Sequence, residues 1–137
     1  MEERRNAVQR RAGALGLLAA AVAAATPALA CELPPGKRVE SAALALSYRT
    51  VPAKIAVGEP FVLELAACPK GVAPLPGRVK LDAHMPEHKH GMNYRPSIAP
   101  AGAGRYRSEG WIFHMPGRWE FVFDFGPERL VDSVRIE

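Results

Sequence analysis

A two-residue period in the aromatic side chains near the end of the chain limits its fold more than any other feature. Apolar residues occupy alternate positions there, and charged residues fill most positions between them, in the two sets Trp119, Phe121, Phe123, Phe125 and Arg118, Glu120, Asp124. Successive side chains of an extended chain point to opposite faces, so this pattern predicts a β-strand with one buried face. Similar alternation predicts strands over residues 44–49, 61–67, 78–84 and 130–136.

Turn sequences separate these stretches, and the chain contains 13 prolines, which argue against long helices. Short strands at this spacing predict an all-β fold, an immunoglobulin-like antiparallel β-sandwich of about seven strands. One of the seven would be a short strand within residues 93–99. A bulge at Gly110 would let Tyr106 and Trp111 both face the core. The predicted core comprises Phe61, Leu63, Leu65, Val79, Leu81, Trp111, Trp119, Phe121, Phe123 and Phe125.

Residues 1–30 have the three parts of a cleavable signal peptide. A basic start is followed by an apolar run over residues 12–25 and by the small-x-small cleavage sequence Ala28-Leu29-Ala30. The apolar run is shorter than the roughly 20 residues that span a bilayer. We therefore expect one mature domain, residues 31–137, that is periplasmic or secreted and has no membrane span. An uncleaved membrane anchor is the alternative.

The mature chain is close to electrically neutral. The signal peptide holds four of the 18 basic and two of the 14 acidic residues, which leaves a net charge of +2 for residues 31–137. The sequence shows no basic stripe of the kind that nucleic-acid-binding domains present. We therefore expect no nucleic-acid partner.

The chain contains two cysteines, Cys31 and Cys68. An exported chain lives in an oxidising compartment, so a Cys31–Cys68 disulfide is the expectation. The alternative is a lipoprotein acylated at Cys31, directly after the cleavage sequence. Lipoprotein signals usually carry Leu three residues before that cysteine, where this chain has Ala28.

All the histidines, and all the methionines after the first residue, lie in two short segments. The set is His84, Met85, His88, His90, Met92, His114 and Met115. Imidazole binds copper and zinc, whereas a thioether is a soft ligand that favours Cu(I). The combination predicts a metal site built from these seven residues, with copper as the metal and zinc as the less favoured alternative.

The tripeptide His-Met-Pro occurs twice, at residues 84–86 and 114–116, each time where a predicted strand runs into a turn. The third and fifth strands of a sandwich run in the same direction, one in each sheet, so both tripeptides would lie at one end. By parity, His84 and His114 would both face outward, with the 85–92 loop folded over them. In the alternative interpretation the methionines fill gaps in the core and the histidines are merely solvated.

At these motifs the chain resembles the YtkA-like family of small envelope domains, which is related to the FixH-type accessory proteins of respiratory oxidase assembly. The resemblance covers roughly residues 40–136. It rests on His84-Met85-Pro86, His90-Gly91-Met92, Gly104-Arg105-Tyr106 and Phe113-His114-Met115-Pro116-Gly117-Arg118-Trp119, in family order. It implies an immunoglobulin-like sandwich with a link to copper. Unlike the FixH-type proteins, this chain begins with a cleavable-looking signal.

Three functions follow from these observations. The first is an exported protein that binds or delivers copper, with a copper-receiving or oxidase-assembly protein of the envelope as partner. The second is a metal-free immunoglobulin-like module for interaction or assembly in the envelope. The third is a zinc hydrolase that uses Glu87 beside the histidines, which would need an open metal position. No catalytic set stands out, so we expect that the protein is not an enzyme.

Overall fold

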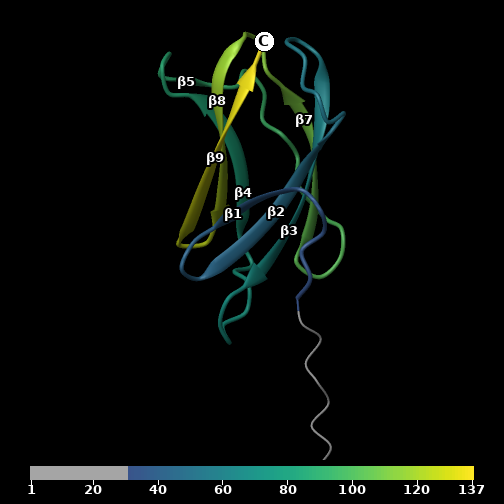
Figure 1. Cartoon of the computed structure of the whole chain (residues 1–137), viewed down its shortest axis with the longest axis vertical. Helices are drawn as coiled ribbons and strands as arrows, with labels where there is room; N and C mark the ends of the chain where they lie inside the picture. Colours follow the sequence, from purple (N-terminus) through teal and green to yellow (C-terminus); the bar gives the residue numbers. More distant parts are fainter. Residues whose placement is uncertain (1–30) are drawn as a thin grey trace, which may run out of the picture.

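The computed structural model describes residues 31–137, and its regular elements are all β-strands (Figure 1). The strands are β1 (Lys37–Glu40), β2 (Leu44–Val51), β3 (Pro60–Pro69), β4 (Val79–Met85), β5 (His90–Gly91), β6 (Ala99–Pro100), β7 (Arg105–Ile112), β8 (Gly117–Phe125) and β9 (Glu128–Ile136). The predicted all-β class is confirmed. The predicted signal peptide, residues 1–30, lies outside the described residues. Within residues 31–137 no helix is long and apolar enough to cross a membrane.

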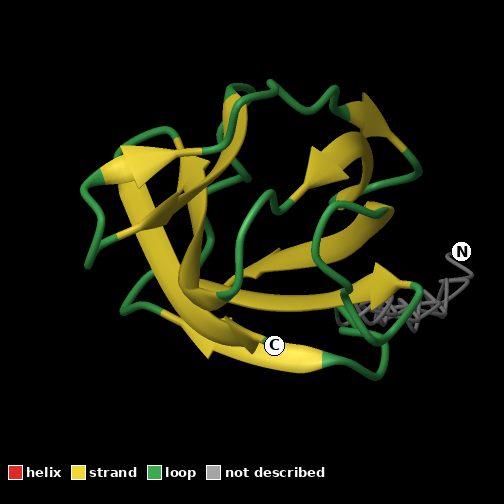
Figure 2. Cartoon of the chain, turned by 90° about the horizontal axis from the view of Figure 1, so that it is seen from above, coloured by secondary structure: helices red, strands yellow, loops and turns green. Residues whose placement is uncertain are grey.

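The strands form two antiparallel sheets that face one another, as in a β-sandwich (Figure 2). One sheet has the order β1-β2-β3-β7-β6 and the other has the order β5-β4-β8-β9. The prediction of about seven strands missed β1 and β5. β1 has the sequence Lys-Arg-Val-Glu, which lacks the apolar alternation, and β5 contains only two residues. The short strand expected within residues 93–99 lies at Ala99–Pro100 instead.

Six aromatic side chains form the centre of the core between the sheets. Trp111, Phe113, Trp119, Phe121, Phe123 and Phe125 are all at most 1% exposed. The predicted strand register is therefore confirmed, because a shift of one residue would turn these side chains to solvent. Val79 and Leu81 were also predicted in the core but are only partly buried. They lie in the half of β4 that pairs with β8 alone, since β5 pairs only with His84 and Met85.

A bulge interrupts the pairing of β3 with β7. Phe61 pairs with Trp111 and Leu63 pairs with Ser108, so β7 holds one more residue than β3 over this interval. Gly110 lies in the bulge with φ of 88°, a backbone conformation that suits glycine. The predicted Gly110 bulge is confirmed, and it places both Ser108 and Trp111 in the interior.

The predicted bond between the two cysteines is confirmed: Cys31 and Cys68 form a disulfide with their Cα atoms 5.7 Å apart. The bond fixes the first described residues to Cys68, near the end of β3. Ser47 continues this attachment, because its hydroxyl donates a hydrogen bond of 2.6 Å to the carbonyl oxygen of Pro34. Residues 31–36 are thereby held against the five-stranded sheet.

Candidate metal centre

The hairpin that joins β4 to β5 presents two of the histidines. The His88 amide donates a hydrogen bond of 3.2 Å to the Met85 carbonyl oxygen, which closes a turn with Pro86 at its second position. Proline favours that position because its φ is fixed near the value that the turn requires. Lys89 has φ of 53° and completes the reversal, so that His90 pairs with Met85 across the two strands.

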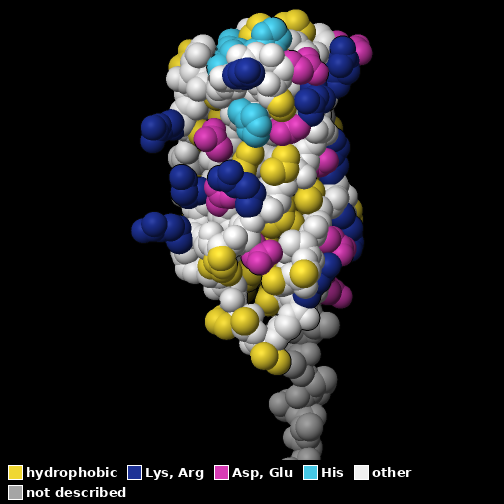
Figure 3. Space-filling model, turned by 90° about the vertical axis from the view of Figure 1, so that its left-hand side faces the viewer, with side chains coloured by type: hydrophobic (Ala, Val, Ile, Leu, Met, Phe, Trp, Pro, Cys, Tyr) yellow, Lys and Arg dark blue, Asp and Glu magenta, His cyan; other side chains and the backbone are white. Residues whose placement is uncertain are grey.

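β4 and β7 run to the same end of the molecule (Figure 1), and histidine side chains gather near that end on the face drawn in Figure 3. The ring centroids of His88 and His90 are 5.8 Å apart, and those of His90 and His114 are 5.2 Å apart. Trp119 lies edge-on to the last two rings, at 6.0 Å from His90 and 5.4 Å from His114. The two His-Met-Pro segments therefore meet at one end of the sandwich.

His114 carries a buried nitrogen that has no hydrogen-bond partner. Its Nδ1 is the single buried side-chain nitrogen or oxygen atom without a partner in the described part of the chain. Buried polar groups in proteins are nearly always paired, because the loss of water otherwise costs free energy. The expectation that the His114 side chain faces solvent is therefore wrong for this atom. The His114 ring is half-buried and packs against Trp119, which in turn stacks on Phe113 with the ring centroids 4.3 Å apart.

The three methionines differ in burial. Met85 is fully buried, and its Cε lies so close to Gly117 that a β-carbon there would collide with it at 2.6 Å. Met92 and Met115 are half-buried and pack against the edge of the core. Met92 follows His90 by two residues, so an extended backbone directs both side chains to the same face. The Trp119 indole donates a hydrogen bond of 3.0 Å to the Met115 carbonyl oxygen and fixes the turn between them.

His84 lies on the opposite face of its sheet from Met85 and His90. Its Nε2 is 3.2 Å from a carboxylate oxygen of Glu120, the residue with which it pairs across β4 and β8. The other oxygen of Glu120 binds Arg118 at 2.5 Å, and Arg118 also reaches Glu87 at 3.4 Å. Hydrogen bonds from Arg118 to Glu87 and then to Glu120 raise the pKa of the guanidinium. The structure thus brings the rings of His88, His90 and His114 together and leaves His84 beside Glu120 on the outer face of the sheet.

As they are positioned, the side chains of residues 31–137 form no group of three or more His, Cys, Asp or Glu residues close enough to hold a metal ion. The ring of His90 lies close to the rings of both His88 and His114. The geometry therefore offers a pair of adjacent imidazoles, His90 and His114, with His88 next in line. Met92 and Met115, which lie near His90 and His114 in the sequence, carry thioethers, which are soft metal donors.

No protein-family model, curated protein or solved structure matches this chain.

The sequence did not identify two residues that shape this site. Trp119 was assigned to the core alone, yet its edge contacts both His90 and His114. Arg118 was identified only as one of the charged residues that alternate with the aromatic positions, yet it connects the hairpin residue Glu87 to the strand residue Glu120. The sequence signal for this contact was the spacing of four residues between Met115 and Trp119. Because the chain turns between these two residues, the indole comes back to the Met115 carbonyl oxygen.

Proposed function

We propose that this protein is an exported copper-binding protein that holds Cu(I) or Cu(II) through His90 and His114 and delivers it to a partner in the cell envelope. The observation that carries the proposal is the buried Nδ1 of His114, which lacks any partner and belongs to a ring 5.2 Å from that of His90. A bound metal ion would give this nitrogen a partner and so offset the free energy that its removal from water costs. The signal-like residues 1–30 support export.

The spacing of the rings supports a shared ion. Two imidazoles with their nitrogens about 2.0–2.1 Å from one ion have ring centroids about 5–6.5 Å apart, depending on the angle at the metal. The separations of 5.2 Å for His90 and His114 and of 5.8 Å for His88 and His90 fall in this range. Rotation of the rings about their side-chain bonds then suffices to aim their nitrogens at one point.

The further donors determine which metal the site prefers. Met92 and Met115 are half-buried and lie near His90 and His114 in the sequence, and their thioethers would favour Cu(I) over Zn(II). His88 is exposed on the hairpin turn and would serve as an additional imidazole. Met85 is fully buried beneath Gly117, so we assign it a packing role. His84 bonds with Glu120 and is not included in the proposed ligand set.

The carboxylates near the histidines support binding over hydrolysis. A zinc hydrolase would need a carboxylate free to act as a ligand or as a general base. Glu87 and Glu120, which flank the cluster, are both engaged by Arg118. We therefore propose a carrier and not an enzyme.

We further propose that the domain is immunoglobulin-like and related to the YtkA-like family. Strand order supports the first part. When β1 and β5 are left out, the two sheets have the orders β2-β3-β7-β6 and β4-β8-β9. In chain order these strands correspond to the ABED and CFG sheets of immunoglobulin domains. The motifs of residues 84–92 and 113–119 support the second part. An oxidase-assembly protein of the envelope is then the class of partner that we expect to receive copper.

Titration of the purified protein with Cu(I), Cu(II) and Zn(II), each in competition with a coloured chelator, tests the proposed function. We expect one equivalent of copper to bind, with Cu(I) held more tightly than Zn(II). If none of the three ions binds stoichiometrically, the metal-free assembly module becomes the better account of the fold.

A further inference from the structure

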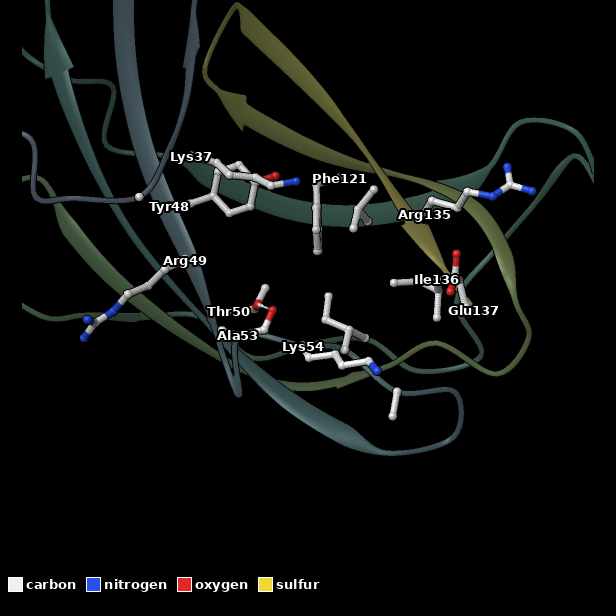
Figure 4. Close-up of a pocket in the computed structure, with 14 residues that line it drawn as sticks. Lys37, Tyr48, Arg49, Thr50, Ala53, Lys54, Phe121, Arg135, Ile136 and Glu137 are labelled. Carbon is white, nitrogen blue, oxygen red and sulfur yellow. Dashed lines mark hydrogen bonds between the residues drawn. The ribbon is translucent and has the colours of Figure 1, made fainter.

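A second candidate site lies at the open edge of the sandwich, where β2 and the segment after it face β9. A cleft of about 720 Å³ opens there, a size typical of sites for small molecules. Its floor is apolar and includes Tyr48, Ile55, Phe121 and Ile136 (Figure 4). The cleft shares no residue with the histidine and methionine cluster.

On this side of the described chain, side-chain hydrogen bonds join the two sheets only along the first part of β9, where the Ser41 hydroxyl donates a hydrogen bond of 2.6 Å to the Glu128 carboxylate. The Tyr48 hydroxyl donates a hydrogen bond of 2.5 Å to the Asp132 carboxylate and so ties β2 to β9. Beyond that tie, the loop that contains Ala53, Lys54 and Ile55 stands away from the last residues of β9, and the core side chain of Phe121 forms the floor between them.

The charge at the opening is mainly positive. The lining includes the basic residues Lys37, Arg49, Lys54 and Arg135, and one acidic residue, Glu137. Glu64 already neutralises Arg49 at 2.6 Å. Among the described residues no carboxylate lies within ion-pair distance of Lys37 or Lys54, which enter the cleft from opposite sides (Figure 4).

We propose that this cleft binds an amphipathic carboxylate, a small molecule with an apolar body and one terminal anionic group. The apolar body lies against Ile55, Val134 and Ile136, where its burial removes hydrocarbon surface from water. The carboxylate lies at the opening between the ammonium groups of Lys37 and Lys54. A cationic or neutral molecule of the same shape would lack this second interaction.

Calorimetric titration of the purified protein with decanoate, below the concentration at which it forms micelles, tests the proposal. We expect saturable binding of one molecule. The double substitution Lys37→Gln, Lys54→Gln should weaken it at least tenfold, because both side chains are exposed and their loss leaves the fold intact. Lys80→Gln removes an exposed lysine elsewhere and should leave the affinity within twofold.

Decanol provides the matched ligand without charge and should bind at least tenfold more weakly than decanoate. Methyl NMR signals of Ile55, Val134 and Ile136 should shift on decanoate binding, and the signal of the exposed Ile98 should not. Equal affinity for decanol and decanoate, an unchanged affinity of the double variant, or shifts located elsewhere would each overturn the proposal. The copper titration is independent of all of these results, because the two sites share no residue.

Discussion

The imidazole rings of His90 and His114 lie 5.2 Å apart, although one residue lies in a strand and the other in the connection between the two sheets. His90 begins β5 in the four-stranded sheet, whereas His114 follows the end of β7 in the five-stranded sheet. An ion held by both would therefore join β5 to the connection between β7 and β8. Since such an ion binds the folded chain and not the unfolded one, it also stabilises the fold.

Substitution of single histidines should separate the proposed ligands from the outer residue. We expect His90→Ala and His114→Ala each to weaken Cu(I) binding at least tenfold, because each removes one imidazole of the adjacent pair. His84→Ala is the matched control, since His84 bonds with Glu120 on the other face of the sheet. Competition with a Cu(I) chelator gives the affinities. A loss with His84→Ala as large as that with His114→Ala would contradict this assignment.

Tryptophan fluorescence should report copper binding, because Trp119 contacts both His90 and His114. Cu(II) quenches an indole that lies nearby. The chain has a second tryptophan, Trp111, so the experiment is best done in Trp111→Phe, which leaves Trp119 as the only emitter. We expect quenching that saturates at one equivalent of Cu(II). Its disappearance in His114→Ala would link the signal to this site.

Period-two alternation was sufficient to predict the core, because each strand buries one face. Phe121, Phe123 and Phe125 are all buried, and the positions between them hold Val122 and the half-buried Asp124. Val122 departs from the pattern, because it is only 6% exposed although it lies on the other face. The Gly110 bulge was predictable because Tyr106 and Trp111 have opposite parity and yet both are large and apolar. β1 could not be predicted in this way, since only Val39 among its residues contacts the core.

The candidate site was less predictable than the core. Composition located the two His-Met-Pro segments, and strand direction placed them at the same end. Which histidines meet depends on the pairing of Met85 with His90 across a two-residue strand, which no pattern in the sequence indicates. That pairing turns His90 toward His114 and leaves His84 beside Glu120.

Phe121→Ala should destabilise the fold by about 3–5 kcal/mol, because Phe121 is buried and its ring contacts those of Tyr48, Phe61 and Trp111. Urea unfolding followed by circular dichroism measures the change. Val131→Ala, at a site that is 42% exposed, is the control and should change stability by less than about 0.5 kcal/mol.

Replacement of both cysteines by serine should destabilise the domain by about 3–4 kcal/mol in the chain-entropy model, since the disulfide joins residues 37 positions apart. Urea unfolding of the double variant, compared with the oxidised protein, measures the loss. Copper affinity should stay the same, because the bond lies at the N-terminal segment and not at the histidine cluster. An unchanged unfolding midpoint would show that residues 31–36 contribute little to the fold.

The bond from Tyr48 to Asp132 should give the fold a dependence on alkaline pH. Burial, and then the hydrogen bond to Asp132, raise the pKa of the Tyr48 hydroxyl. The folded tyrosine therefore keeps its proton where the unfolded one, with a pKa of about 10, loses it. At pH 8 we expect Tyr48→Phe to be less stable than the natural protein by about 1.5–3 kcal/mol, the contribution of a hydrogen bond to a charged group.

That difference should shrink as the pH rises above about 10, because the unfolded natural chain then gains stability from ionisation that the phenylalanine variant lacks. Denaturant unfolding of both proteins between pH 8 and pH 11 measures it. A gap that stays constant over this range would argue against a proton held by Tyr48.

The extra residue at the bulge of β7 determines which face of the sheet the following side chains occupy. Their direction depends on the number of residues in the bulge and not on which residues these are. Deletion of Gly110 would keep every other residue of the segment and yet turn Trp111 and Phe113 toward solvent. His114 would leave the neighbourhood of His90 at the same time. At the exposed Glu109, insertions and deletions are therefore far less tolerable than substitutions are. At Gly110 the positive φ disfavours substitution as well.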